Sequence, residues 1–364
     1  MNVLYITNIP SPYRVDFFNE LGKYCNLTVA FERVSARDRD RKWKPDGFAA
    51  FGAVFLKGTP LGTDASLSLQ VIPIIKRGYH IIVLGGYSSP TYAIAMEYMK
   101  ARGIPFILNA DGGFIKQDKK PVYWLKRHLI GLPSAWLSTG AQTDLYLEHY
   151  GASARRIYRY PFTSVKEKEC FLPSGEEKAD KKRQLHMKEE VIVITVGQFI
   201  YRKGCDLLIR CSRKLRPNMG IYIIGGEPGE EYRRLLAEEG TGNIHFEGFK
   251  NREELRDYYI AADIFVFPTR EDIWGLVLNE AMAHGLPCVA SQQAIASREM
   301  IEPGINGYLV NPEELDEMSG RLNQLADSEE ERIKLGENAC RKAKEHTIEK
   351  MALRHMEIFR ELAQ

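Results

Sequence analysis

An acidic loop runs into a glycine and then an apolar helix in the segment Thr269–Ser291, TREDIWGLVLNEAMAHGLPCVAS. Asp272 precedes the expected helix start near Gly275, and Glu280 follows Asp272 by eight residues, inside the helix. The first turn of a helix presents unpaired backbone N–H groups and the positive end of the helix dipole, which together bind anions. The segment therefore offers an anion site between two carboxylates that can bind hydroxyls. A sugar nucleotide has this complementary pattern of hydroxyls, diphosphate and hydroxyls.

Two adjacent cations, Arg202 and Lys203, lie where a loop leaves an expected strand in VGQFIYRKGCDLLI (Val196–Ile209). Fixed positive charges at this place could neutralise a departing diphosphate and so lower a reaction barrier. The alternative is a solvated basic loop. Gly225, in IIGGEP (Ile223–Pro228), could let the backbone approach a phosphate or a base, although glycine is also common in any tight turn.

The first half of the chain has a separate acid, Asp111, in the strand-end segment NADGGF (Asn109–Phe114). A carboxylate there could orient or polarise an acceptor hydroxyl, and an ordinary Asp-Gly turn is an equal alternative. Tyr13 and Arg14, in TNIPSPYR, could contact the same acceptor, or Arg14 could only support local structure. Because TNIPSPYR has no glycine, it is not a G-x-G-x-x-G phosphate loop.

The segment Ile115–Leu129, IKQDKKPVYWLKRHL, mixes cations with aromatic and aliphatic residues. This composition is typical of a helix that docks on a membrane interface, but we slightly favour a surface helix that buries its apolar face in its own domain. The Asp38-Arg39-Asp40 triplet is interpreted as solvated surface. Because the histidines lack metal-ligand spacing, no metal site is expected.

Short apolar runs alternate with amphipathic stretches along the whole chain. The expected strands are Val3–Thr7, Leu27–Phe31, His80–Leu84, Pro105–Asn109, Ala135–Ser138, Ile157–Tyr160, Val191–Val196, Ile221–Ile224, Ile244–Glu247, Ile264–Phe267 and Cys288–Ala290. The expected helices are Val15–Tyr24, Pro90–Arg102, Pro121–Ile130, Gln142–Tyr150, Lys203–Leu215, Glu230–Glu239, Arg252–Ala262 and Leu276–His284. This alternation predicts an α/β chain with parallel sheets covered on both faces.

The domain prediction follows from a polar, broken stretch in the middle of the chain. Residues 1–165 should form a first doubly wound, Rossmann-like domain, 166–190 a linker, and 191–346 a second such domain that faces the first across a cleft. Residues 347–364 have apolar positions at helical spacing, so they should form a helix that docks one face.

Composition is that of a soluble protein, with 44% hydrophobic and 27% charged residues, and no apolar run of about 18 residues. The six scattered cysteines and the absence of a signal-peptide pattern in MNVLYITNIPSPYR suggest a cytoplasmic protein. Residues 1–165 carry 21 Lys and Arg against 12 Asp and Glu, whereas the remainder carries 29 against 36. Either the first half faces something anionic, or the two halves attract each other.

The second half resembles the retaining glycosyltransferases of the GT-B fold, glycosyltransferase family four. The acid-x7-acid pattern of Asp272 and Glu280 carries the resemblance, together with VGQFIYRKGCDLLI, IIGGEP and EGFKNREELRDYYIAADIFVFPT. In the first half, NIPSPYRVDFFNELGK and the strand–helix rhythm carry a looser likeness. The resemblance implies a GT-B fold whose last helix crosses back to the first domain.

The resemblance also implies roles for single residues. Glu280 would bind the ribose hydroxyls and Asp272 would lie near the donor sugar. Lys203, with Arg202, would stabilise the leaving diphosphate without a metal ion. The backbone at the helix start would contact donor sugar and diphosphate, through Gly275, Leu276 and Val277.

Three positions depart from the family pattern. The family usually has Glu where this chain has Asp272, and Glu271 lies one residue earlier. It usually has a basic residue where this chain has Gln198 on the donor side. Asp111 stands near the place of a family histidine.

We therefore expect a cytoplasmic enzyme that moves a sugar from a nucleotide-diphosphate donor to a saccharide or lipid-linked acceptor with retained configuration. The resemblance suggests cell-surface polysaccharide or lipopolysaccharide synthesis. The cation-rich segment Ile115–Leu129 separately allows peripheral contact with an anionic membrane, and no nucleic-acid partner is expected. Two alternatives stay open: a non-hydrolysing nucleotide-sugar epimerase, and a noncatalytic nucleotide-sugar-binding protein.

Overall fold

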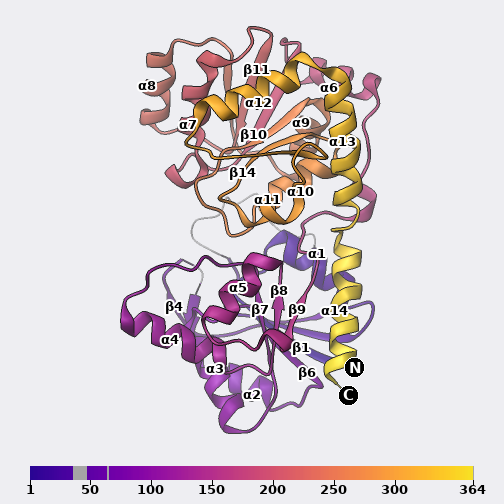
Figure 1. Cartoon of the computed structure of the whole chain (residues 1–364). Coiled ribbons are helices and arrows are strands. Elements are labelled where there is room, and N and C mark those ends of the chain that lie inside the picture. Colours follow the sequence, from indigo (N-terminus) through magenta and orange to yellow (C-terminus); the bar gives the residue numbers. More distant parts are fainter. Residues whose placement is uncertain (36–46, 64, 364) are drawn as a thin grey trace. The chain divides into compact units, whose positions relative to one another are not determined.

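The computed structural model describes residues 1–35, 47–63 and 65–363. The chain divides into two compact units (Figure 1): unit 1 comprises Met1–Ser164 together with the C-terminal segment from Thr347, and unit 2 comprises Val165–His346. Asp38 and Asp40 lie outside the described residues. Among the described residues, no helix is both long enough and apolar enough to cross a bilayer.

Unit 1 is built on a parallel sheet of seven strands in the order β3-β2-β1-β6-β7-β8-β9. The chain starts in the middle of the sheet, builds outward to β3, and then returns to build the other side from β6. This reversal is the Rossmann pattern, and it opens a ligand-binding position at the strand C-termini beside the central strand. The strands are β1 (Asn2–Thr7), β2 (Asn26–Phe31), β3 (Gly52–Phe55), β6 (Ile81–Leu84), β7 (Ile107–Ala110), β8 (Ala135–Ser138) and β9 (Ile157–Arg159), with a separate hairpin β4 (Thr59–Leu61) and β5 (Ala65–Leu67).

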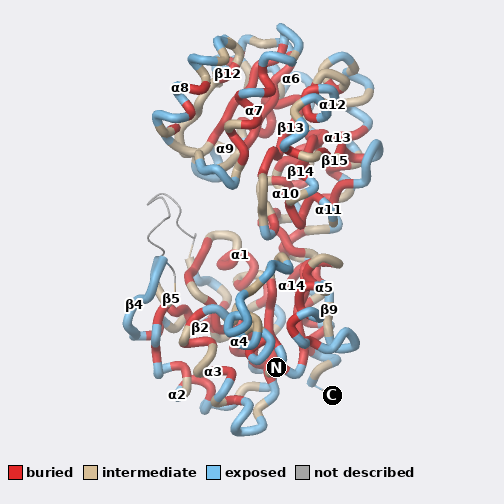
Figure 2. The backbone as a smooth tube through the Cα atoms, turned by 60° about the vertical axis from the view of Figure 1, so that its left-hand side comes forward, coloured by how far each residue is buried: buried red, intermediate tan, exposed pale blue. Residues whose placement is uncertain are grey.

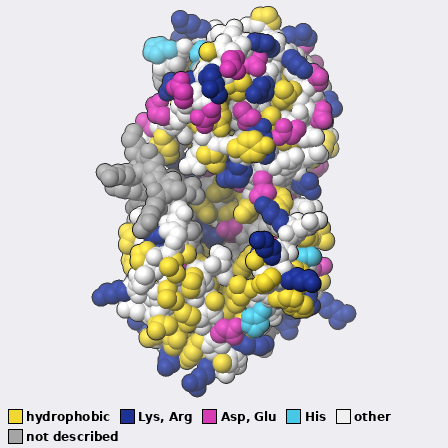
Figure 3. All heavy atoms as spheres, turned by 90° about the vertical axis from the view of Figure 1, so that its left-hand side faces the viewer, with side chains coloured by type: hydrophobic (Ala, Val, Ile, Leu, Met, Phe, Trp, Pro, Cys, Tyr) yellow, Lys and Arg dark blue, Asp and Glu magenta, His cyan; other side chains and the backbone are white. Residues whose placement is uncertain are grey.

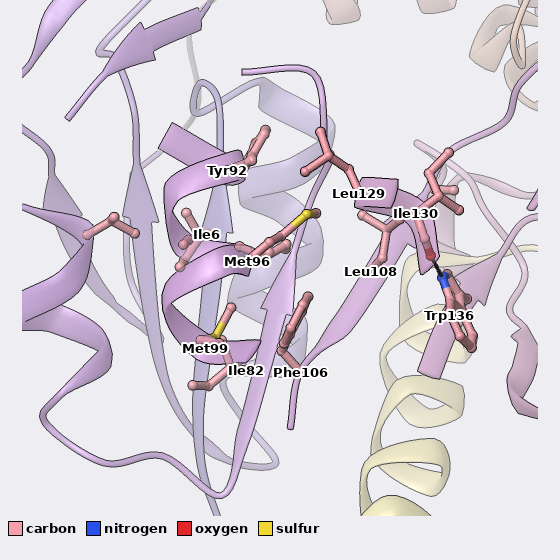
Figure 4. Close-up of a cluster of buried hydrophobic side chains, with 14 of the residues drawn as sticks. Ile6, Ile82, Tyr92, Met96, Met99, Phe106, Leu108, Leu129, Ile130 and Trp136 are labelled. Atoms are coloured by element: carbon pink, nitrogen blue, oxygen red, sulfur yellow. Dashed lines mark hydrogen bonds between the residues drawn. The ribbon is translucent and has the colours of Figure 1, made fainter. Parts of the chain in front are cut away.

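The helices of unit 1 cover both faces of this sheet (Figure 1). They are α1 (Pro12–Leu21), α2 (Val71–Ile75), α3 (Pro90–Ala101), α4 (Lys120–Gly131), α5 (Ala141–His149) and α14 (Ile348–Leu362), with a 3₁₀ turn η1 (Ala154–Arg156). Figure 4 shows the core on one face, where Met96 and Met99 of α3 lie against strand residues such as Ile82. From α4, Leu129 and Ile130 enter this core and Tyr123 packs against it, and Trp136 Nε1 donates a 2.8 Å hydrogen bond to the Ile130 carbonyl.

The last helix, α14, belongs to unit 1 and packs against α1. Its N-cap Thr347 accepts a 3.3 Å hydrogen bond from the Lys350 N–H, which satisfies one of the free donors of the first turn. Apolar residues at helical spacing, including Met351 and Phe359, are buried along one face of the helix.

Unit 2 repeats the Rossmann order in a parallel sheet of six strands, β12-β11-β10-β13-β14-β15. The strands are β10 (Val191–Val196), β11 (Met219–Ile224), β12 (Ile244–Glu247), β13 (Ile264–Phe267), β14 (Cys288–Ser291) and β15 (Gly307–Val310). Figure 2 shows the central strands as buried tubes inside more exposed helices, which is why they read as continuous apolar runs. The direction of building reverses between β10 and β13, so the loops after these two neighbouring strands frame the expected binding position.

The helices of unit 2 are α6 (Gly175–Gln184), α7 (Cys205–Cys211), α8 (Glu230–Glu239), α9 (Arg252–Ala261), α10 (Leu276–Ala283), α11 (Ile295–Met300), α12 (Leu315–Asp327) and α13 (Glu329–Ala343), with 3₁₀ turns η2 (Glu167–Glu169), η3 (Tyr201–Lys203) and η4 (Ser212–Lys214). Between Ser291 and Thr347, where the sequence predicted no elements, the structure adds the edge strand β15 and the helices α11, α12 and α13. The shorter of these elements have weak apolar periodicity in the sequence.

The predicted linker 166–190 is wrong, because this segment is part of unit 2. Its polar composition comes from α6, which begins with a capping box at Ser174 and packs on α9. Lys178 and Lys182 of α6 contact the two carboxylate oxygens of Asp263 at 2.9 and 2.7 Å. Burial raises the pKa of Asp263, but the two lysines and the Ile192 N–H outweigh it and hold the pKa below its usual range.

The predicted helix Lys203–Leu215 is also corrected. It is divided into η3, α7 and η4, and Lys203 lies in the turn before the helix. The break occurs at Gly204, whose φ of +69° is left-handed and whose added Cβ would lie 2.0 Å from the Pro268 carbonyl oxygen.

Candidate functional site

The structure brings the predicted cations and the first predicted acid together in unit 2. Lys203 Nζ lies 2.5 Å from Asp272 Oδ2, and Arg202 NH1 lies 3.4 Å from Asp272 Oδ1. Arg202 and Lys203 come from the loop after β10, and Asp272 comes from the loop after β13. Since β10 and β13 are neighbours at the reversal of the sheet, the fold places these charges at the position where such sheets bind ligands.

The two loops are held together by backbone contacts as well as by charges. The Arg202 carbonyl accepts 2.8 Å hydrogen bonds from the Thr269 hydroxyl and from the Arg270 N–H. The aliphatic stem of Lys203 lies over Gly197, where an added Cβ would come within 3.4 Å of it. The Lys203 side chain is only 17% exposed, so its ammonium is positioned by packing rather than extended into solvent.

Arg270 is a structural residue that the sequence did not single out. It forms a bidentate pair with Asp206 at 2.7 and 2.6 Å and a further 2.6 Å contact with Glu313. Its guanidinium lies 4.0 Å from the ring centre of Tyr201. These hydrogen bonds raise its pKa above the ordinary value, so Arg270 stays charged and fixes the two loops to each other.

Helix α10 begins at a glycine that no other residue could replace without strain. Gly275 has φ +102°, and a Cβ on it would lie 2.6 Å from the Phe267 ring. This left-handed residue turns the chain into α10, whose first N–H groups, on Leu276 and Val277, have no acceptor within the helix. The turn therefore presents free N–H donors at the place where the sequence predicts an anion site.

The second predicted acid, Glu280, lies in the second turn of α10 and is held by α9. The Tyr259 hydroxyl donates a 3.0 Å hydrogen bond to Glu280 Oε2. Burial, and then the negative charge of Glu280, raise the pKa of Tyr259 well above its usual value, so Tyr259 remains a donor. The Tyr259 ring is stacked on His284, whose Nδ1 lies 2.8 Å from the Glu280 carbonyl oxygen. Tyr259 is a positioning residue; it lies within the segment EGFKNREELRDYYIAADIFVFPT, but the sequence assigned it no role.

The glycine turn after β11 closes against the loop after β10. A Cβ on Gly225 would lie 1.8 Å from the Gly197 carbonyl oxygen and 3.2 Å from the Gln198 backbone nitrogen. Gly225 and Gln198 are thus neighbours beside Lys203, and the Gln198 side chain is exposed. The predicted donor-side residues of unit 2 therefore gather at the C-terminal edge of a single sheet.

Glu271 and Asp272 differ in what they offer. The backbone carbonyl of Glu271 accepts a 2.9 Å hydrogen bond from Arg202. The Asp272 carboxylate instead forms ion pairs with both Arg202 and Lys203. Asp272 is also fixed through its backbone, because Ile295 N–H donates to its carbonyl at 3.1 Å. The geometry favours Asp272 as the first acid.

The predicted acceptor-side residues come together in unit 1. Arg14, at 4% exposure, forms an ion pair with Asp111 Oδ2, while Asn109 and Tyr160 donate to Oδ1 at 2.8 and 3.2 Å. Burial alone would lower the pKa of Arg14, but Asp111 together with the surrounding tyrosines outweighs it and the pKa rises. Tyr13 lies beside the guanidinium at 5.8 Å. Arg14 is enclosed, whereas the Asp111 side chain is 27% exposed, so Asp111 is the group available to a ligand.

Within the part of the chain that the structure describes, no three His, Cys, Asp or Glu side chains are arranged to hold a metal ion. The charge that could meet a diphosphate in unit 2 comes from Lys203, Arg202 and the α10 turn.

Residues 176–342 match the family model described as "Glycosyl transferases group 1". The match covers 167 of the 364 residues, a little under half of the chain. The matched segment contains every donor-side residue discussed above, and it lies entirely within unit 2. The match supports the coarser prediction of a glycosyltransferase of group 1, and the retaining, family-four assignment stays a prediction.

The chain is 29% identical over 220 residues to D-inositol 3-phosphate glycosyltransferase of Corynebacterium aurimucosum, covering 56% of this chain and 51% of that protein. It is 26% identical over 207 residues to O-antigen chain mannosyltransferase C of Escherichia coli, covering 54% of each. The chain thus spans about half the length of the curated relatives that it matches.

The structure of Anabaena Alr3699/HepE in complex with UDP-glucose is similar over 100% of this chain and 98% of that one, with a TM-score of 0.75 and 16% identity. This likeness extends beyond the glycosyl transferases group 1 segment to unit 1. It confirms the predicted GT-B fold.

Proposed function

We propose that this protein is a retaining glycosyltransferase that takes a sugar from a nucleotide-diphosphate donor. The observation that carries the proposal is the cluster of Lys203, Arg202 and Asp272 at the sheet edge, in the same segment as the α10 turn and Glu280. The relative Alr3699/HepE has been solved with UDP-glucose, which supports a nucleotide-sugar donor here.

In the proposed mechanism, the α10 turn and Lys203 neutralise the diphosphate as it departs, and Glu280 binds the ribose hydroxyls. Stabilising the charge that develops on the leaving group lowers the barrier without a protein nucleophile or a metal ion. Asp272 keeps the Lys203 ammonium in place through their ion pair. In this mechanism the Asp272 carboxylate also contacts a hydroxyl of the donor sugar. Asp111 of unit 1 orients the acceptor hydroxyl.

We further propose a saccharide or lipid-linked acceptor in cell-surface polysaccharide synthesis, at the inner face of the cell membrane. The match to O-antigen chain mannosyltransferase C supports this pathway class. The basic first half of the chain, with 21 Lys and Arg against 12 Asp and Glu in residues 1–165, is consistent with an anionic acceptor or surface.

The test is a product assay with a panel of nucleotide-diphosphate sugars and saccharide acceptors in the presence of a chelator. The expected result is release of nucleoside diphosphate together with a glycoside of unchanged anomeric configuration, as determined by NMR. An epimerised donor formed without acceptor would instead indicate an epimerase. Tight donor binding with neither transfer nor hydrolysis would indicate a binding protein.

A further inference from the structure

Helix α4 of unit 1 leaves three large apolar side chains in solvent. Val122 is 44% exposed, Trp124 63% and Leu125 58%, and Ile115 in the preceding segment is 52% exposed. Apolar groups that are close in sequence and this exposed are unusual unless a partner covers them. We define the α4 surface as Ile115, Val122, Trp124 and Leu125 together with Lys119, Lys120 and Arg127.

The sequence-based preference for a helix that buries its apolar face in its own domain is wrong for these residues. Leu129 and Ile130, at the end of α4, are buried in the core (Figure 4), and the partly buried Tyr123 packs against it. At 3.6 residues per turn, Trp124 lies about 120° around the helix from Ile130, with Lys120 and Arg127 next to it at i−4 and i+3. Tyr123 and the last turn anchor the helix, and Val122, Trp124 and Leu125 are exposed.

The α4 surface is positively charged. Lys119, Lys120 and Arg127 are exposed, and within the described part of the chain none of them forms an ion pair with an acid. The acids close by in sequence or space are already engaged. Asp118 contacts Lys126 at 2.9 Å, and Glu97 contacts His128 at 2.5 Å.

A shallow groove of about 330 Å³ lies at the side of Trp124. It is lined by Lys100 of α3 and by Trp124, Arg127, His128, Gly131 and Leu132. Lys100 and Arg127 beside the Trp124 indole match an anionic lipid headgroup whose acyl chain continues along the apolar side chains. Indole rings favour the boundary between hydrocarbon and water.

We propose that the α4 surface docks this protein onto an anionic lipid bilayer. The apolar side chains enter the headgroup boundary, and the lysines and arginine face the lipid phosphates. Figure 3 shows hydrophobic side chains gathered on this face of unit 1, with Lys and Arg among them. The inference stands on exposure and charge alone and does not depend on the proposed transfer reaction.

Charge complementarity favours a bilayer over a second copy of the chain. A symmetric dimer through this surface would bring Lys120 and Arg127 of one copy toward the same cations of the other, which is repulsive. An anionic bilayer matches both the exposed apolar side chains and the positive charge of the α4 surface. It accommodates apolar side chains at any spacing, and its negative charge is distributed over many headgroups.

The experiment is co-sedimentation of the full chain with phosphatidylglycerol–phosphatidylcholine vesicles and with pure phosphatidylcholine vesicles. We expect binding to the former, weak binding to the latter, and loss of binding as salt rises from about 0.1 to about 1 M. Neutralising three charges in Lys119→Gln/Lys120→Gln/Arg127→Gln should weaken binding about 100-fold, on the order of fivefold per charge. Trp124→Ala/Leu125→Ala should weaken it at least about tenfold.

The matched control is Ile333→Ala/Lys334→Gln, an exposed apolar–basic pair on α13 of unit 2, which should change binding less than about twofold. Quenching by brominated lipids should be reduced in Trp124→Phe. Because the substituted side chains are exposed, all variants should keep the wild-type melting temperature. Equal binding to both vesicle types, unchanged binding of the α4 variants, or self-association that these variants abolish would each overturn the proposal.

Discussion

Lys203 and Asp272 form an ion pair of 2.5 Å between the loops that follow β10 and β13. Two residues that are 69 positions apart in the sequence are thus in contact at the edge of the unit 2 sheet. The pair holds the Lys203 ammonium at the sheet edge, 5.8 Å from the centre of the Phe267 ring on which Gly275 packs. Preorganised charge of this kind costs no rearrangement during reaction, which is why it is effective in catalysis.

Replacing Lys203 should slow transfer more than it destabilises the protein. Lys203→Met removes a positioned charge from the leaving diphosphate, and we expect kcat to fall by about 10²–10³-fold. Lys203→Arg should recover part of the loss. Lys214→Met, which breaks the exposed Lys214–Asp316 pair of the same unit, is the control and should leave kcat unchanged. Steady-state kinetics that show equal losses for Lys203→Met and Lys214→Met would contradict the assignment.

Removing the Tyr259 hydroxyl should weaken donor binding through Glu280. Tyr259→Phe deletes the 3.0 Å hydrogen bond to Oε2, and the loss of about 1 kcal/mol should raise the donor Kd about fivefold. Calorimetry with the bound nucleotide sugar measures this change. The adjacent Tyr258, whose hydroxyl donates to Glu247 at 2.7 Å, offers a matched control in Tyr258→Phe. Comparable weakening by both variants would show that Tyr259 does not act through Glu280.

Substituting the first residue of the α10 turn should destabilise unit 2. In Gly275→Ala, φ +102° is unfavourable and the new Cβ meets the Phe267 ring at 2.6 Å. Together these should cost about 2–4 kcal/mol in urea unfolding. Gly320→Ala in α12, where an added Cβ meets no atom within 4 Å, should instead be neutral or stabilising by up to about 1 kcal/mol. A fully stable Gly275→Ala would contradict the described geometry.

His355 on α14 should make the protein sensitive to acid. Burial lowers its pKa to about 4, and the nearby charges of Arg14 and Arg354 act in the same direction. In the unfolded chain, His355 therefore binds a proton near pH 6.5. In the folded chain it binds that proton only near pH 4. Stability from neutral His355 is complete above about pH 6.5 and falls by about 3 kcal/mol as the pH drops to 4.

The measurement is urea unfolding from pH 7 to pH 4.5 for wild type, His355→Leu and the exposed-site control His80→Gln. His355→Leu should flatten the pH dependence, and His80→Gln should retain it. An unchanged slope in His355→Leu would place the acid sensitivity elsewhere.

Much of the fold could be predicted because buried parallel strands are continuous apolar runs. Segments such as Val191–Val196 are almost entirely buried, so their sequence alone indicates their position. The linker prediction failed because α6 contacts its unit through lysine–carboxylate pairs with Asp263 rather than through an apolar face. Edge strand β15 is short and follows no strong pattern, which left it unassigned.

The candidate site could be proposed from the sequence where backbone and charge follow a linear motif, as with Lys203, Gly275 and Glu280, whose roles stay predictions. The supporting residues were not, because they come from other elements. Tyr259 reaches Glu280 from α9, and Tyr160 reaches Asp111 from the end of β9. Their roles depend on tertiary packing, and a tyrosine within a helix or at a strand end has no distinguishing sequence pattern.

The central claim is that the sheet edge of unit 2 holds a nucleotide-diphosphate sugar between Lys203, the α10 turn and Glu280. Isothermal calorimetry with a panel of uridine and guanosine diphosphate sugars, on wild type, Glu280→Ala and Lys203→Met, tests it directly. The account predicts that at least one donor binds the wild type and that each substitution weakens it at least about tenfold. A donor that binds both variants as tightly as wild type, or a panel in which nothing binds the folded protein, would contradict it.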